Sequence, residues 1–525
     1  MKRLCTLGLA VLLLQALPAR LPGADDAKPD PRKVAALLKD LKGSDAVKKR
    51  QAAVALGGMS SAAAEAVPVL AEMLKDSDAK MRWVAALSLG HLGEVAKGAV
   101  PQLTAALKDK DERVVHASAI ALGSVGEAAR EAVPGLIGVL SGSKSANARQ
   151  AAAVALADIG PDAKSAVPAL AKALDDASAG VREHAAVALG QIGPPAKEAV
   201  PALARALQDK DVNVRDAAVV SLEAIGPDAR EAVPALRKAL SESDAGVREN
   251  VVRALAAIGP DAVAAVPDLV ALLKDKDEDL RLEAIKALGH IGPAAKEAVP
   301  PLVKQLEDKE PDIRERAARA LGDIGPDALT AVPPLIKLLN DKEADVRIGA
   351  ARGLAGIGKG TKEVVEALVK ELANNDTDVR QRATQVLADL GPDAAPAVPE
   401  LLRLLKEDKA AEVCVGAAMA LTRLGATKGV VPGLAAALKN SSPQVRHAAA
   451  YALGDIGKDA HEAVKPLTEA LDDKDAEVRT EAAFALGSIG KEAKSAIPEL
   501  KKLTKDKDAV IRKAAAEAIK SIEGK

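Results

Sequence analysis

Aromatic side chains are almost absent from this chain of 525 residues, which contains one Trp, one Tyr and one Phe. Surfaces that stack bases, sugars or aromatic cofactors need such side chains, so they have little material here. A basic excess is lacking as well, because 73 Lys and Arg residues are balanced by 74 Asp and Glu residues. That balance disfavours a dedicated nucleic-acid binder, and we expect no nucleic-acid partner.

Cysteine and catalytic motifs are equally scarce. Cys5 lies in an apolar N-terminal stretch, and Cys414 is the only other cysteine, so we expect no disulfide within the rest of the chain. No phosphate-binding loop, no Gly-x-Ser-x-Gly turn and no Cys-x-x-Cys pair occurs in the sequence. We therefore expect no catalytic residues and no cofactor.

The N-terminal stretch has the pattern of a secretory signal. Lys2 and Arg3 precede an apolar run, LCTLGLAVLLLQAL, and Pro18 follows it. The run is too short to span a bilayer comfortably but suits the hydrophobic region of a signal peptide. The sequence therefore predicts an exported protein, periplasmic or extracellular, and an uncleaved N-terminal membrane anchor is the alternative.

The domain boundaries follow from this pattern. Residues 1–24 are predicted to be the signal peptide, with cleavage after Ala19 or Ala24. Residues 25–30, DDAKPD, form a polar linker, and a periodic region occupies 31–525. We expect no further transmembrane segment.

A 33-residue repeat fills the periodic region. The unit at residues 259–291 recurs in fifteen copies, which align on one position at spacings of 33 residues and occasionally 32 or 34. Twelve of the fifteen copies carry Arg at that position, which we call the Arg position. A fixed period of this length is typical of a solenoid, in which each unit packs only on its neighbours.

Each unit is predicted to hold two amphipathic helices, helix A and helix B. Apolar residues recur at helical spacing in two groups, Val266, Leu269 and Leu273 for helix A and Leu280, Ala284, Leu288 and Ile291 for helix B.

Three residue types mark the ends of these helices. Asp277 is placed to cap the N-terminus of helix B, and Gly289 and Gly292 are expected to end it. Pro267 falls inside the pattern of helix A, which is therefore either kinked at Pro267 or begins there after one loose turn.

The repeated Pro267, Asp275 and Arg281 positions resemble those of HEAT repeats, in particular the short bacterial type of phycobilin-lyase-like proteins. The resemblance implies an all-α, right-handed α-α superhelix of the armadillo or HEAT type, with about fifteen two-helix repeats. It also implies a ladder of Asp and Arg between neighbouring units. Val115 and Cys414 replace Arg and are predicted to interrupt that ladder.

Some HEAT-like proteins are enzymes, and deoxyhypusine hydroxylase holds two irons with paired His-Glu motifs. Here the six histidines are scattered, and only His461-Glu462 has that order. Metal ligands must converge to about 2.0–2.2 Å from the ion, which one pair cannot provide. We therefore expect no metal site, and a lyase-like or hydroxylase-like enzyme remains only the alternative.

One row of positions differs systematically between the repeats. It lies five residues after the Arg position, so stacked copies of helix B would align it along one side of the solenoid. We call it the variable row. Its residues are Val54, Leu87, Ile120, Val154, Val187 and Val220, then Arg253, Lys286, Arg319 and Arg352, then Gln385, Met419, Tyr451, Phe484 and Glu517.

The variable row suggests a binding surface for a protein or peptide, and its basic block favours an acidic one. The candidate partner-binding residues are Arg253, Lys286, Arg319, Arg352, Arg316, Arg382, Met419, Tyr451 and Phe484. The alternative is a solvated face, because Glu249, Glu283 and Glu315 stand three or four residues before a basic partner. The apolar block, in turn, is either exposed or buried between units. We predict a non-enzymatic scaffold for protein interactions.

Overall fold

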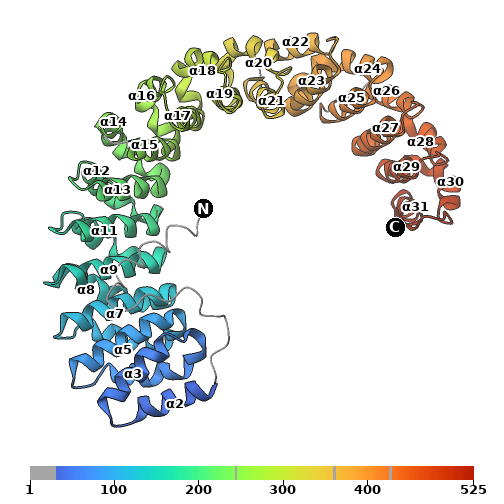
Figure 1. Ribbon diagram of the computed structural model, residues 1–525. Coiled ribbons are helices and arrows are strands. Elements are labelled where there is room, and N and C mark those ends of the chain that lie inside the picture. The colour runs from blue at the N-terminus through green and yellow to red at the C-terminus, as the bar shows by residue number, and fades with distance from the viewer. Residues whose placement is uncertain (1–30, 243–244, 359–361, 425–428, 525) are drawn as a thin grey trace. The chain divides into compact units, whose positions relative to one another are not determined.

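The computed structural model is built from helices stacked in two layers (Figure 1). It describes residues 31–242, 245–358, 362–424 and 429–524. The predicted signal peptide, its cleavage positions and the linker at 25–30 lie outside these residues. The chain divides into two compact units at Ala202, and each is described separately below.

The first unit contains five copies of each helix. Its helix A copies are α2 (Pro31–Lys42), α4 (Val67–Met73), α6 (Val100–Ala106), α8 (Val133–Gly142) and α10 (Val167–Ala173). Its helix B copies are α3 (Ala46–Gly57), α5 (Ala79–Leu92), α7 (Glu112–Val125), α9 (Ala146–Ile159) and α11 (Ala179–Ile192). The boundary between the units falls within the next helix A copy, α12 (Val200–Ala206).

The second unit contains ten copies of helix B. They are α13 (Val212–Ile225), α15 (Ala245–Ile258), α17 (Glu278–Ile291), α19 (Pro311–Ile324), α21 (Ala344–Gly358), α23 (Thr377–Leu390), α25 (Ala411–Arg423), α27 (Pro443–Ile456), α29 (Ala476–Ile489) and α31 (Ala509–Glu523). Together with the five of the first unit, they confirm the fifteen predicted repeats.

The helix A copies of the second unit form the other layer. They are α14 (Val233–Glu242), α16 (Val266–Leu272), α18 (Val299–Gln305), α20 (Val332–Leu338), α22 (Lys362–Glu371), α24 (Val398–Glu407), α26 (Val430–Ala437), α28 (Val464–Ala470) and α30 (Ile497–Leu503). The core between the layers is aliphatic, as predicted, and side chains such as Leu269, Ala284 and Leu288 are fully buried in it.

The recurring proline marks the start of helix A, not a kink within it. In the reference repeat a 3-10 turn, η8 (Gly259–Ala265), leads into α16, and Pro267 lies in the first turn of that helix. Proline suits this place because its fixed φ is helical and its missing N–H has no partner in a first turn. The second of the two predicted alternatives is therefore confirmed.

The predicted N-cap of helix B is also confirmed. Asp277 Oδ1 accepts hydrogen bonds from the backbone N–H groups of Asp279 (3.0 Å) and Leu280 (3.4 Å). Gly292 follows α17 with a φ of 67°, a conformation that favours glycine and turns the chain into the next repeat.

The prediction that Gly289 ends helix B is wrong. Gly289 lies inside α17 and is buried. A Cβ atom there would come within 3.2 Å of the Ala320 Cα atom on α19. This glycine therefore permits the close approach of two neighbouring helix B copies.

Arginine and aspartate form the implied ladder at several of the contacts between successive repeats. Arg82 Nε and Nη2 donate to both carboxylate oxygens of Asp109, at 2.6 and 2.9 Å, and Nη1 donates to the carbonyls of Asp76 and Ser77. The same fork joins Arg149 to Asp176, Arg314 to Asp341, Arg380 to Asp408 and Arg446 to Asp473. Arginine suits this position because its planar fork can bond the carboxylate and its own loop at once.

The two predicted interruptions of the ladder involve both partners. Ser143 stands where the acid opposite Val115 would be, and Asn440 stands opposite Cys414. At the first, the Ser143 hydroxyl donates instead to Glu112 at 2.7 Å. At the second, the buried Cys414 Sγ donates to the Asp408 carbonyl at 3.4 Å, as the Nη1 atom of an arginine does in other repeats. The first interruption thus keeps a polar contact between repeats, whereas the contact at the second lies within its own repeat.

One helical stretch among the described residues, 246–272, has the length and apolar composition needed to cross a membrane. It is not a single straight helix, because Gly259, with a φ of 73°, separates α15 from η8 and α16. Its apolar residues include Val251, Leu255 and Leu269, which are fully buried in the helical core. The stretch is therefore explained as part of the solenoid.

Candidate functional site

The variable row keeps solvent access in both units. In the first unit Val54 is 45 % exposed, and Leu87, Ile120, Val154 and Val187 are half-buried. The apolar block is thus partly buried, and Val54 is its most exposed member in this unit.

Four of the predicted basic residues surround a single hollow of about 340 Å³, which we call the basic hollow. Lys286 comes from α17, Arg316 and Arg319 come from α19, and Arg352 comes from α21. The hollow thus joins three successive helix B copies. The predicted residues Arg253 and Arg382 do not line it.

The predicted pairs within helices have formed and neutralise much of this charge. Lys286 Nζ lies 2.5 Å from the Glu283 carboxylate, and Arg319 Nε forms an ion pair with the carboxylate of Glu315. Arg316 Nε lies 3.6 Å from the same buried Glu315 side chain. Intrahelical pairs of this kind contribute only a few tenths of a kcal/mol, about 0.2–0.5.

The two remaining basic candidates are also paired. Arg253 Nη1 lies 3.0 Å from Glu249 on the same helix, and its Nε lies 3.5 Å from Glu223 on α13. Arg382 Nη2 lies 3.4 Å from Asp378. In the part of the chain that the structure describes, Arg352 is the member of the basic block with no ion pair, and it is exposed.

Two residues of the basic hollow escaped the sequence reasoning, His290 and Asp323. Each stands one helical turn after a member of the variable row, since His290 follows Lys286 by four residues and Asp323 follows Arg319 by four. Although Asp323 keeps an exposed edge, desolvation by its neighbours raises the pKa of its carboxyl, and the charges of His290 and Arg319 oppose that shift. Examining the positions four residues after the variable row would have identified both His290 and Asp323.

Glycine sets the spacing of the helices that form this hollow. Gly322 on α19 and Gly356 on α21 line it, and a Cβ atom on Gly356 would overlap the Gly322 carbonyl. A Cβ atom on Gly353 would likewise overlap the Ala318 carbonyl. The two helices therefore meet backbone to backbone, which brings Arg352 close to the cations of α19.

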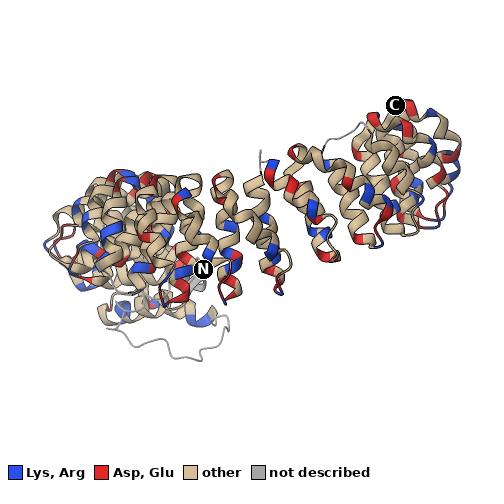
Figure 2. Cartoon of the chain, turned by 90° about the horizontal axis from the view of Figure 1, so that it is seen from above, with Lys and Arg blue, Asp and Glu red and all other residues tan. Residues whose placement is uncertain are grey.

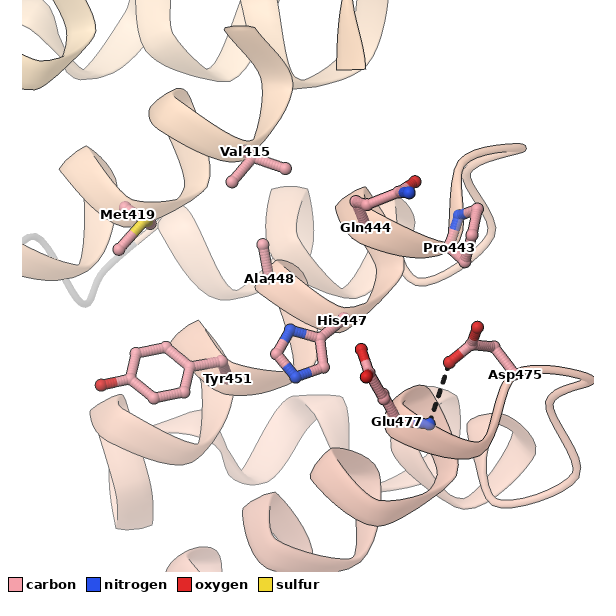
Figure 3. A pocket seen from close by; sticks show the side chains of 9 residues that line it. All are labelled: Val415, Met419, Pro443, Gln444, His447, Ala448, Tyr451, Asp475 and Glu477. Carbon is pink, nitrogen blue, oxygen red and sulfur yellow. Dashed lines mark hydrogen bonds between the residues drawn. The ribbon is translucent and has the colours of Figure 1, made fainter. Parts of the chain in front are cut away.

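A second hollow of about 380 Å³ lies toward the C-terminal end of the variable row, and we call it the aromatic hollow (Figure 3). Met419 of α25 and Tyr451 of α27 line it, as predicted candidates, together with His447. His447 Nε2 lies 3.8 Å from the carboxylate of Glu481 on α29. Burial raises the pKa of the Glu481 carboxyl, and the charge of His447 opposes that shift. The third candidate, Phe484, is 42 % exposed but does not line the hollow.

Charge of both signs is distributed over the helices and the loops between them (Figure 2). Within the described residues, no three His, Cys, Asp or Glu side chains gather as a group that could hold a metal ion. The two hollows on the helix B layer combine a concave shape with distinctive chemistry.

The structure is an α-solenoid. Its two-helix repeats are stacked, an Arg-Asp ladder joins several of them, and a row of side chains runs along one layer. A family model described as HEAT repeats matches the chain in overlapping segments from residue 34 to residue 520, leaving few of those residues unmatched. The chain belongs to the HEAT-repeat family. A model described as PBS lyase HEAT-like repeat matches residues 148–176, in agreement with the resemblance noted from the sequence.

Solved structures with this type of fold share little of the sequence of this chain. Kap121p shares 15 % sequence identity with a TM-score of 0.51, over 94 % of this chain and 57 % of that chain. Importin beta shares 15 % identity with a TM-score of 0.46, over 94 % of this chain and 85 % of that chain. At these identities the similarity concerns the fold alone. No curated protein shows significant similarity to this sequence.

Proposed function

We propose that this protein is a non-enzymatic scaffold that binds an acidic segment of a partner protein along its helix B layer, outside the cytoplasm. The main support is the basic hollow, where cations from three successive helices face one space. Extended repeat surfaces suit such binding because each repeat adds a few weak contacts. The N-terminal signal pattern supports the location.

Arg352 is the residue on which an acidic ligand would depend most. Lys286, Arg316 and Arg319 already face Glu283 or Glu315, so a ligand carboxylate must share them with internal partners. Arg352 has no ion-pair partner among the described residues to give up, so its planar guanidinium can bind a ligand carboxylate directly. Helices in contact pack about 8–10 Å apart. A peptide in the polyproline II conformation has three residues per turn and rises about 3.1 Å per residue, so side chains three residues apart lie on one face about 9 Å apart. A segment with a carboxylate at roughly every third residue would match the hollow.

The Arg352→Glu variant is expected to bind such a segment at least tenfold more weakly, because it replaces an attraction with a repulsion. A 12-residue fluorescent peptide with Glu at every third position would be titrated by anisotropy at low and high salt. Wild-type affinity should fall as salt rises, since exposed charges are screened.

The Arg230→Glu variant is the matched control. Arg230 is exposed on a 3-10 turn, η7 (Gly226–Ala232), so the charge change is the same but lies outside the helix B layer. It should leave peptide binding unchanged. Equal losses in the two variants would show that only net charge matters and would contradict the proposed surface. Bound iron or a bilin chromophore in the purified protein would contradict the non-enzymatic role.

Export can be tested on the mature N-terminus. If the signal peptide is cleaved as predicted, the protein recovered outside the cytoplasm should begin at Arg20 or Asp25, as read by terminal sequencing or intact mass. Replacing Leu12 and Leu13 with Arg should block export, because a charged hydrophobic region cannot serve as a signal. An unprocessed chain that stays in the cytoplasm would contradict the proposed location.

A further inference from the structure

The protein exposes both its only Tyr and its only Phe, in adjacent repeats. Tyr451 is 49 % exposed and Phe484 is 42 % exposed, and Met419, one repeat earlier on the same row, is 44 % exposed. The cores of these repeats are filled by aliphatic side chains instead. Exposed aromatic and Met side chains are enriched at protein interfaces and supply much of their binding energy.

The aromatic hollow has an apolar end and an acidic end (Figure 3). Val415 and Met419 of α25 lie near Tyr451 at the apolar end. Asp475 and Glu477, at the start of α29, form the other end. None of the nine described side chains that line the hollow belongs to Lys or Arg.

The acidic end has capacity left for a cation. Asp475 uses Oδ1 to cap α29, accepting from the N–H groups of Glu477 (2.9 Å) and Val478 (3.2 Å). Each of its carboxylate oxygens can accept more than one bond, so capping leaves Oδ2 available. The Glu477 side chain is exposed and points into the same space.

We propose that the aromatic hollow docks a partner segment in which a Leu or similarly bulky aliphatic side chain stands beside an Arg. The aliphatic group packs on Met419 and Tyr451, and the guanidinium lies against Asp475 and Glu477. This chemistry is opposite in charge to that of the basic hollow. The inference deepens the proposed role in protein binding by giving the same layer a second site with its own ligand.

The unique aromatics provide the test. Full-length protein labelled with 3-fluorotyrosine should give one ¹⁹F resonance, from Tyr451, and 4-fluorophenylalanine should give one from Phe484. The probe is the nine-residue peptide Gly-Ser-Leu-Arg-Leu-Arg-Leu-Ser-Gly. It should shift the Tyr451 resonance in a saturable way. A second peptide with both Arg residues replaced by Glu should not.

Two variants assign the effect to the acidic end. Glu477→Lys should weaken the Arg peptide roughly tenfold or more, because it places a cation where the guanidinium binds. Glu492→Lys, with the same charge change on an exposed turn outside the hollow, should not. No shift of Tyr451, an equal shift with the Glu peptide, or no effect of Glu477→Lys would overturn the proposal.

The Arg352→Glu variant separates this inference from the proposed function. It should weaken the acidic peptide of the earlier test and leave the Arg peptide unchanged. Binding of the acidic peptide without binding of the Arg peptide would overturn the second site alone. Binding of the Arg peptide alone would leave this site standing and contradict the basic one.

Discussion

Replacing Arg314 with alanine is expected to lower the free energy of unfolding by about 3 kcal/mol, because it breaks a buried ion pair and leaves one charge uncompensated. Arg314 is 7 % exposed. Its Nε and Nη2 donate to Asp341 at 2.9 Å each, and its Nη1 donates to the carbonyls of Asp308 and Lys309. The variant loses two bonds to the following repeat and two to its own loop. Urea unfolding followed by circular dichroism measures the loss.

Arg281→Ala is the matched control in the same position of another repeat. Arg281 keeps the bonds to its own loop, at 3.0 and 3.3 Å, but its Nε is buried without a hydrogen-bond partner among the described residues. Its removal should cost only about 1 kcal/mol, as for two ordinary hydrogen bonds shared with solvent. Equal losses at the two positions would contradict a stabilising role for the carboxylate.

The pH dependence of the Arg314 effect follows from Asp341. Burial alone would raise the pKa of this carboxyl, but the hydrogen bonds from Arg314 and the Glu343 N–H, together with the charge of Arg314, hold the pKa below the usual 3.8. A lowered pKa in the folded state adds stability above the unfolded pKa. The difference between wild type and Arg314→Ala should therefore be complete above about pH 4–5 and shrink as pH falls through the lowered pKa.

Gly353→Ala is expected to destabilise the protein by about 2 kcal/mol and to weaken binding in the basic hollow as well. The added methyl group would overlap the Ala318 carbonyl, so α19 and α21 must move apart. Alanine favours a helix over glycine by about 1 kcal/mol, which offsets only part of the strain. As the helices separate, Arg352 should move away from Arg319. Urea unfolding and the acidic-peptide titration would measure the two effects.

The Gly138→Ala variant is the matched control, and it is expected to be more stable than the wild type. Gly138 also lies inside a helix, α8, but no atom lies within 4 Å of where its Cβ would be. This change should stabilise the protein by about 0.5–1 kcal/mol through helix propensity and the unfolded state. A loss of stability at Gly138 as large as at Gly353 would show that close packing is not the cause.

Local chemistry made most of the repeat predictable. Asp277 caps a helix with its own side chain, Pro267 sets its own φ, and the Asp and Arg positions recur at the period of the array. Each of these effects acts within one repeat or between two neighbours. The residue pattern therefore predicted the two-helix unit and the repeat number, and the resemblance to HEAT repeats implied the ladder.

Only some of the residues that line the two hollows could be predicted, because the shape of each hollow depends on how closely neighbouring helices approach. The variable row identified Lys286, Arg319, Arg352, Met419 and Tyr451, which do line them. Asp475 and Glu477 were missed, since they come from the start of the next helix B copy and not from the row. The close contact at Gly353 was missed because glycine in a repeat was interpreted only as a helix stop.

The interruptions of the ladder limit the order in which repeats can be joined. Where the arginine fork forms, as from Arg82 to Asp109, the acid lies on the following repeat, whereas Val115 is followed by Ser143 and Cys414 by Asn440. The two partners of such a fork thus belong to different repeats. A shuffled array that placed the Cys414 repeat before a successor with Asp would bury that acid without its cation. Engineers who duplicate, delete or permute these modules should exchange them as matched adjacent pairs.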